Sequence, residues 1–222
     1  MRFFKFNKDY NFNWKYVIGE TALIFMGISL AIWFNNWNTS NRSNKDKDIA
    51  IVKITEEITN NLVEIQIAQD SNQQTAEAFA EFKKLFDGNS PNVIATPSEL
   101  NGLQKKYPAF FVSIDSTLLE PGTYRYSGET RIQLEIPPLT QIAWETSRTM
   151  AITNEFSYEC LYELESLYNL QRRVQNEIDK ASDALQKRAL TDLMNILRVT
   201  DQLNRQLIDD YNEMLNKIKF CR

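Results

Sequence analysis

Histidine does not occur in this chain of 222 residues, and cysteine occurs only at Cys160 and Cys221. These shortages exclude zinc sites with four protein ligands, His-based catalytic triads and Glu-x-x-His di-iron sites. Two widely spaced cysteines are also too few for a disulfide framework. Cys160 lies among apolar residues of a predicted helix, so we expect a buried, unreactive thiol there. Neither cysteine decides the cellular compartment.

Glycine is scarce as well. The six glycines form neither a phosphate-binding loop nor a dinucleotide-binding fingerprint, so nucleotide hydrolysis has no support. Carboxylates do cluster, and such clusters are able to perform acid–base catalysis or to bind a hard cation. We expect them on the solvent faces of amphipathic helices, with nothing that gathers them into a common pocket. The sequence therefore predicts no enzymatic activity, no cofactor and no metal site. The clusters are Glu56 with Glu57, Glu163 with Glu165, and Asp209 and Asp210 with Glu213.

The formal net charge of −4 is unevenly distributed. Residues 1–15 form a tail rich in basic and aromatic side chains, in which Asp9 is the only anion, whereas the chain after Asn38 is acidic. An acidic domain repels phosphate backbones. The charge distribution therefore argues against nucleic acid as a partner, without excluding it.

One long apolar run, from Val17 to Phe34, dominates the N-terminal part of the chain. Its 18 residues carry a single charge, Glu20, and as a helix they span about 27 Å, close to the hydrocarbon thickness of a bilayer. No small-x-small cleavage site follows the run, which disfavours a cleaved signal peptide. We therefore predict a transmembrane helix over residues 16–38, with the lipid bilayer as a partner. Aromatic residues typical of membrane interfaces flank the run at Trp14, Tyr16, Trp33 and Trp37.

The basic residues that orient a membrane helix are nearly balanced on its two sides. Four lie in the N-terminal tail and four follow the apolar run, at Arg42, Lys45, Lys47 and Lys53. The positive-inside rule slightly favours a cytoplasmic N-terminus and a periplasmic C-terminal domain. The opposite topology stays open.

A narrow stripe of small and polar residues interrupts the bulky side chains of the apolar run. Its members lie within about 20° of one line along a helix with 100° per residue. One interpretation is a contact between helices, with Glu20 close enough to the boundary to reach the interface. The other is an oligomeric pore, because intramembrane ionisable residues commonly face partners or water. Both interpretations predict a homo-oligomer. The stripe consists of Glu20, Gly27, Ala31 and Asn38, and the pore would be lined by Glu20, Asn35, Asn36 and Asn38.

The same segment resembles the N-terminal anchor of an uncharacterised family of bacterial single-pass membrane proteins. The resemblance rests on about 23 residues with a pattern of the type YxxGExxLIxxGIxxAxxxNNWN, roughly a tenth of the chain. It implies one anchor in the bacterial inner membrane followed by a mainly helical remainder, and it implies no particular activity. The matching residues are Tyr16, Gly19-Glu20, Leu23-Ile24, Gly27-Ile28, Ala31 and Asn35-Asn36-Trp37-Asn38.

Residues 39–222 are predicted to form one soluble, mainly helical domain. Apolar residues recur at spacings of three and four from Ile51 to Phe86, and again over two long segments in the C-terminal third. Thr96-Pro97-Ser98-Glu99 has the cap, the proline and the Glu of a helix start. The polar stretch from Asn41 to Asp48 leaves open whether the anchor continues into the domain as one helix. The predicted fold is an antiparallel helical bundle, with long helices over about 46–86, 157–188 and 191–220 and a shorter one over about 138–150, after Pro137-Pro138.

The helical period is lost between about residues 87 and 137. Ile132, Leu134 and Ile136 alternate with polar residues, and Ser127-Gly128 is a turn signal, so we expect a small β-hairpin. Basic residues and tyrosines also alternate here. In other proteins that bind nucleic acids, aromatic rings stack on bases and basic side chains bind phosphates. Packing of the tyrosines against the bundle explains the same pattern. The candidate ligand-binding residues are Lys105, Lys106, Tyr107, Tyr124, Arg125, Tyr126 and Arg131.

Three functions fit these observations. The first is a non-enzymatic, homo-oligomeric membrane protein whose anchors assemble into a pore or another membrane effector, gated by a ligand or partner of the bundle, as in bacterial defence. The second is a helical sensor or scaffold held in the periplasm by the anchor, for a protein partner or a small ligand. The third is a cytoplasmic domain that responds to a nucleotide, an oligonucleotide or another anionic ligand.

Overall fold

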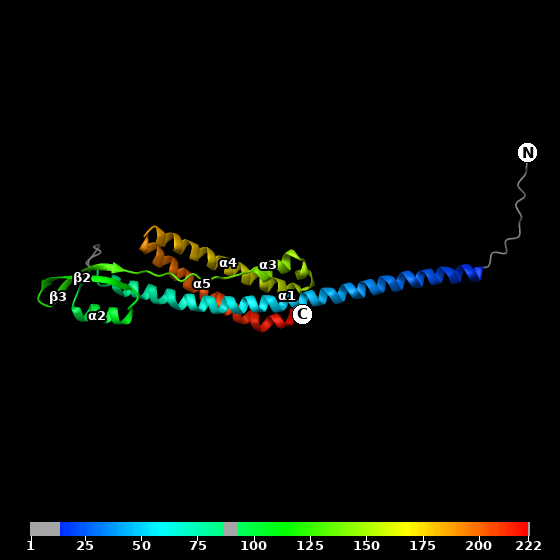
Figure 1. Ribbon diagram of the computed structural model, residues 1–222, viewed down its shortest axis with the longest axis horizontal. Helices are drawn as coiled ribbons and strands as arrows, with labels where there is room; N and C mark the ends of the chain where they lie inside the picture. Colours follow the sequence, from blue (N-terminus) through cyan, green and yellow to red (C-terminus); the bar gives the residue numbers. More distant parts are fainter. Residues whose placement is uncertain (1–13, 87–92, 222) are drawn as a thin grey trace, which may run out of the picture.

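The computed structural model describes residues 14–86 and 93–221. Residues 87–92, with which the region without helical period begins, and nearly all of the basic tail lie outside these residues. The described chain is mainly helical, with five α-helices and one small antiparallel sheet (Figure 1). The mainly helical fold is therefore confirmed. The region predicted to hold a small hairpin contains a three-stranded sheet, but Ile132, Leu134 and Ile136 lie outside its strands.

The first helix, α1 (Trp14–Lys83), extends over 70 residues and runs along almost the entire molecule (Figure 1). It continues without a break through the polar stretch 41–48, so the apolar run and the first helix of the domain are one element. No residue of α1 before Ala50 is buried, whereas from Ala50 onward one face of the helix lies in the core. The helix thus has a protruding N-terminal part and a packed C-terminal part.

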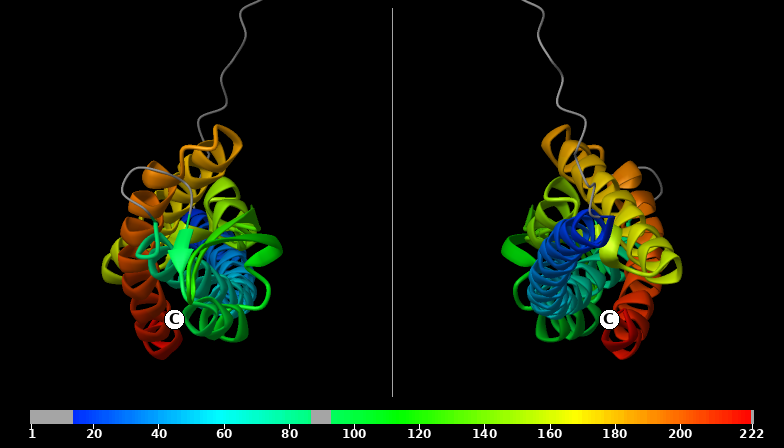
Figure 2. Two further views of the ribbon diagram at one scale, coloured as in Figure 1. Left: turned by 90° about the vertical axis from the view of Figure 1, so that its left-hand side faces the viewer. Right: turned by 90° about the vertical axis from the view of Figure 1, so that its right-hand side faces the viewer.

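The packed part of α1 lies against α5 (Leu190–Lys217), and α5 lies antiparallel to α4 (Tyr158–Gln186) (Figures 1 and 2). The predicted pairing of the two C-terminal helices, with a short connection near residue 188, is confirmed. Arg188 adopts a left-handed conformation with φ of 56°, and Ala189 N–H donates to the carbonyl of Ala184 at 2.9 Å. This is a Schellman-type end that reverses the chain.

The sheet lies at the end of the molecule farthest from the N-terminus (Figure 1). Its strands β1 (Val93–Ala95), β2 (Phe111–Glu120) and β3 (Thr123–Thr130) are ordered β1-β3-β2, and α2 (Pro97–Lys106) follows β1 with the predicted capping box. The predicted turn at Ser127-Gly128 is wrong. The hairpin turns at Pro121-Gly122, where Gly122 has φ of 91°, and Gly128 lies within β3, where a Cβ would overlap the carbonyl of Ser113 on β2.

Residues 131–141, which we call the strap, run back along the bundle in an extended conformation but belong to no strand. Side-chain amides of α1 take the place of a neighbouring strand: Asn72 exchanges two 2.8 Å hydrogen bonds with the backbone of Glu135, and Asn61 does the same with Thr140 at 2.7 and 2.9 Å. Eleven helical residues rise about 16.5 Å, the length of five extended residues, so both pairs meet in register.

The helix predicted over about 138–150 is the shorter α3 (Ile142–Thr149). Its predicted start at Pro137-Pro138 is wrong, because the backbone of Leu139 and Thr140 is already bonded to side chains of α4 and α1 in the strap. Two short 3-10 helices complete the described fold, η1 (Ile152–Glu155) before α4 and η2 (Ile218–Phe220) after α5.

Candidate functional site

One helix among the described residues, α1, contains a stretch long and apolar enough to cross a membrane. Large apolar side chains of this stretch are open on all sides; for example, Leu23 is 70% exposed, Phe25 72% and Trp33 64%. A soluble helix normally buries such side chains against its own domain. In this fold they belong to the part of α1 that protrudes from the domain (Figure 1).

The predicted stripe lies along this exposed part of α1. Glu20, Gly27, Ala31 and Asn38 all lie before the first buried residue, and no atom outside the helix lies within 4 Å of a Cβ built at Gly27. Asn36 lies about 160° from Asn38 around the helix axis, so a contact through the stripe leaves Asn36 on the far side. Asn35 lies nearer the stripe, and its carbonyl accepts a hydrogen bond from Thr39 at 2.9 Å.

The candidate ligand-binding residues gather at the sheet end but do not form one cluster. Tyr107 is buried, and its hydroxyl and the Lys106 ammonium both bond the carboxylate of Glu81, at 3.1 and 2.6 Å. The ammonium of Lys106 is the main cause that lowers the pKa of Glu81. On β3 the rings of Tyr124 and Tyr126 lie 6.1 Å apart. Lys105, Arg125 and Arg131 are exposed, and Arg125 alternates with the tyrosines to the other face of the sheet.

The carboxylate clusters were expected on solvent faces, with no common pocket, and two of them differ from this expectation. Glu163, Asp210 and Glu213 do line a common cavity, between α4 and α5, where the Lys217 ammonium bonds both glutamates at 2.7 Å. Burial raises the pKa of Asp210, with a smaller contribution from Glu213. Within the described residues no group of three Cys, Asp or Glu side chains is placed to hold a metal ion.

The second difference is Glu57, which is only 7% exposed. Its carboxylate accepts hydrogen bonds from the Ala143 and Trp144 N–H groups at 2.8 and 3.3 Å, and from the Tyr168 hydroxyl at 2.7 Å. These N–H groups belong to the first turn of α3, which has no side-chain cap of its own. Glu57 therefore caps a helix that lies far from it in the sequence.

This polar network extends across the bundle to α5. Gln171 accepts a hydrogen bond from the Tyr211 hydroxyl at 2.8 Å and from Asn61 at 3.3 Å. Burial raises the pKa of both Tyr168 and Tyr211, and the bond to Glu57 raises that of Tyr168 further. The network contains no cation, and its donors and acceptors satisfy one another. It is a structural network that joins α1, α3, α4 and α5.

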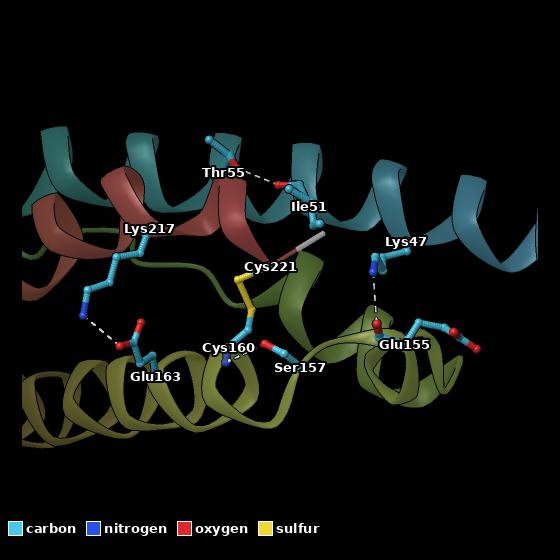
Figure 3. Close-up of a disulfide and its surroundings, with 9 residues drawn as sticks. All are labelled: Lys47, Ile51, Thr55, Glu155, Ser157, Cys160, Glu163, Lys217 and Cys221. Atoms are coloured by element: carbon cyan, nitrogen blue, oxygen red, sulfur yellow. Dashed lines mark hydrogen bonds and ion pairs between the residues drawn. A yellow bond between two sulfur atoms is a disulfide. The ribbon is translucent and has the colours of Figure 1, made fainter.

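Cys160 and Cys221 form a disulfide, so the expectation of a buried free thiol is wrong (Figure 3). The bond ties the first turn of α4 to the end of η2, close to Ile51 of α1. Beside it, the Lys47 ammonium donates to the carbonyl of Glu155 at 3.1 Å. These contacts lie where α1 enters the domain, at the end that faces the apolar run (Figure 1).

No known protein family, curated protein or solved structure matches this chain. The resemblance of the apolar run to the bacterial anchor family therefore stays a prediction.

A groove between α1 and α5 has a volume of about 390 Å³. We call it the α1–α5 groove; residues 69–83 and 191–205 contribute to its walls. Asn204 also lines it; this residue is 3% exposed, and its Oδ1 has no hydrogen-bond partner in the described part of the chain.

The sequence reasoning missed both Glu57 and Asn204. A signal exists for each, because Glu57 falls three residues after Ile54 and one before Ile58, and Asn204 falls three residues before Leu207, in phase with buried apolar positions. A polar residue in phase with an apolar stripe indicates a buried polar group.

Proposed function

We propose that the chain is a membrane-anchored protein whose helical domain acts outside the cytoplasm, as a sensor or scaffold for a small ligand or protein partner. The observation that carries the proposal is the disulfide between Cys160 and Cys221. Disulfides persist in oxidising compartments, whereas cytosolic thiols are kept reduced. The disulfide supports the topology that the basic residues favour only slightly, and it weighs against the cytoplasmic, nucleotide-responsive alternative.

The geometry of α1 supports a domain held at a fixed height above the membrane. From Phe34 to Lys47, whose ammonium donates to the carbonyl of Glu155 in the domain, the helix rises about 20 Å. By the same rise, Lys83 lies about 70 Å beyond Phe34 when α1 stands upright. An unbroken helix resists bending over this length, so the sheet end is presented to partners far from the lipid.

The redox state of the cysteines in cells tests the compartment. The full chain is expressed in a bacterial host, quenched with acid and treated with a large maleimide reagent before and after reduction. We expect no band shift without reduction and a double shift after it. A Cys160→Ser variant, which leaves Cys221 unpaired, is the matched control and shifts once in both samples.

Reporter fusions after Arg222 provide a second, independent readout. An exported domain gives active alkaline phosphatase and a non-fluorescent green fluorescent protein fusion. Thiols that react without reduction, together with a fluorescent fusion, would place the domain in the cytoplasm and overturn the proposal. Retention in the membrane pellet after an alkaline carbonate wash is the expected result for an anchor.

A homo-oligomer joined through α1, with or without a pore, is the second candidate function. Spacings of three, four and seven residues continue the stripe beyond the apolar run onto the solvent face of the packed part of α1. The apolar side chains on this face are 47–60% exposed. We call the whole line the α1 seam; beyond the stripe it contains Lys45, Ile49, Val52, Glu56, Val63 and Ile67.

Two copies anchored in one membrane present the same residues of the seam at the same height. That arrangement favours a parallel, in-register contact. In the pore version, Glu20→Ala abolishes the ion flux of reconstituted liposomes. A monomer by mass measurement in detergent would rule out both the packing version and the pore version.

A further inference from the structure

The α1–α5 groove is lined by Asn204, a buried amide whose oxygen has no hydrogen-bond partner among the described residues. Asn204 is 3% exposed, and its Oδ1 accepts no hydrogen bond from any described residue. Its neighbour Thr200, one turn earlier on α5, is equally buried, and its hydroxyl already donates to the Ile196 carbonyl at 2.9 Å. Buried polar atoms of native proteins almost always have a partner, so this acceptor calls for a donor from a molecule in the groove.

Part of the groove wall is apolar. Ala76 and Phe79 of α1 face Leu197 of α5 across the groove, and all three are buried or half-buried. The volume of about 390 Å³ lies within the range of small-molecule sites. The groove therefore fits an apolar body of about 20 non-hydrogen atoms rather than a chain of ordered waters alone.

The charges around the groove favour an anion. Asp201 accepts hydrogen bonds from both Gln69 and Arg205, at 3.0 and 2.8 Å, so its charge is already compensated. Lys83 and Arg198 also line the groove, and neither makes an ion pair with another residue of the described ranges. Glu77 lines it too, and its carboxylate accepts a hydrogen bond from Gln73 at 2.9 Å. With Arg205, the lining thus has three cations against the two carboxylates of Glu77 and Asp201. The excess of positive charge attracts a negatively charged group.

We propose that the α1–α5 groove binds a small amphipathic anion that has an apolar body, an N–H or O–H donor for Asn204, and a negative group for Lys83 or Arg198. This inference deepens the sensor proposal and rests on it only for the compartment that supplies the ligand. Binding to the purified chain does not depend on topology, so the two proposals fail separately.

Two fluorescent dyes serve as probes, with the full chain in nanodiscs of neutral lipid. Anilinonaphthalene sulfonate combines aromatic rings, one N–H and a sulfonate, whereas N-phenyl-naphthylamine has the same rings and N–H without the charge. Both dyes partition into lipid, so the signal of interest is the saturable component that an Ala76→Phe variant, which places a ring inside the groove, does not show.

We expect Asn204→Leu to weaken the binding of both dyes about tenfold, the loss of one buried hydrogen bond. Arg198→Gln weakens only the sulfonate dye. Asn212→Leu removes an exposed amide from the same helix and leaves both affinities unchanged. Asn204→Leu should also unfold no earlier than the native chain, because it removes an unpaired polar group.

Three results overturn the proposal. The first is the absence of a saturable component for either dye, which is expected if water alone or a helix of a partner protein fills the groove. The second is equal binding by the native chain and the Ala76→Phe variant, which places the dyes elsewhere. The third is equal weakening by Asn204→Leu and Asn212→Leu, which removes the role of the buried amide. If Asn204→Leu does not fold, the comparison of the native chain with Ala76→Phe still tests whether the dyes bind in the groove.

Discussion

At the scale of single residues, two adjacent glutamates have opposite roles. Glu56 lies at the surface and pairs with Lys53 at 2.7 Å, with its side chain 56% exposed, whereas Glu57 is buried and caps α3. We expect Glu57→Ala to lower the free energy of unfolding by about 2–4 kcal/mol, since it removes the cap and leaves the Tyr168 hydroxyl and two N–H groups unpaired. Urea unfolding measures the change.

The neighbouring position supplies the control for this substitution. Glu56→Ala should change the unfolding free energy by no more than about 0.5 kcal/mol, because exposed ion pairs contribute little. Equal effects at the two positions would contradict the capping role. Adjacent carboxylates look alike in a list of charged residues, and only the helical phase of Glu57 relative to Ile54 and Ile58 distinguishes them.

The buried tyrosines make a second prediction, which concerns alkaline pH. Burial raises the pKa of Tyr168 and Tyr211, so above about pH 10 the unfolded chain loses protons that the native state keeps. The native state then binds more protons than the unfolded state, and the free energy of unfolding falls by up to about 1.4 kcal/mol per pH unit for each tyrosine. Below pH 10 the contribution of both side chains is fully present.

Tyrosine-to-phenylalanine variants separate the titration of the buried tyrosines from that of lysines. Tyr168→Phe and Tyr211→Phe should each reduce the slope of unfolding free energy against pH between about pH 10 and 11.5. Tyr158→Phe removes a tyrosine that is 83% exposed and should leave the slope as it is in the native chain. A slope that is the same in all four proteins would show that the buried hydroxyls do not titrate differentially.

At the scale of elements, a local signal predicted a helix start correctly where no distant contact competes with it, and wrongly where a distant residue decides the start. The start of α2 depends on Thr96, Pro97 and Glu99, which are neighbours in the sequence, and its capping box is present. The start of α3 depends on Glu57, which lies 85 residues before Ile142. Nothing in residues 137–142 indicates that Glu57 caps this helix. The prediction from the local prolines therefore placed the helix start too early.

The predicted position of the hairpin turn was wrong for a related reason. Both Ser127-Gly128 and Pro121-Gly122 are local turn signals, and only strand pairing selects between them. Gly128 is required in the sheet because β2 approaches its backbone closely. The candidate groove was also unpredictable, since its two walls come from α1 and α5, and their relative position follows from the packing of the whole bundle.

The strap makes the third prediction. Asn72→Ala removes both hydrogen bonds to Glu135, so we expect the Glu135 amide to exchange with deuterium at least tenfold faster. A loss of about 1–3 kcal/mol of unfolding free energy should accompany the change. Hydrogen-exchange mass spectrometry of the strap measures the exchange rate. Gln73→Ala, at an exposed neighbouring position, is the control. Unchanged exchange in Asn72→Ala would mean that apolar contacts alone hold the strap.

At the scale of the whole molecule, the fact that matters most is that α1 is one unbroken helix. The stripe from Glu20 to Asn38 and the exposed side chains from Ile49 to Ile67 belong to one seam only because they lie on one unbroken helix. An insertion that rotates one part of the seam relative to the other therefore tests whether two chains touch along the whole seam or only along the stripe.

Insertions between Asn41 and Arg42 produce this rotation. Two alanines rotate the domain by about 200° relative to the anchor, whereas seven rotate it by about −20° and nearly restore the seam. If both parts of the seam join two chains, the two-residue insertion should weaken association in detergent about tenfold, and the seven-residue insertion should recover most of it. Analytical ultracentrifugation measures the affinity, and an intact Cys160–Cys221 disulfide verifies that each domain is folded. Equal affinities in all three proteins would confine the contact to the anchor, and the exposed face of the domain would then be free for a different partner.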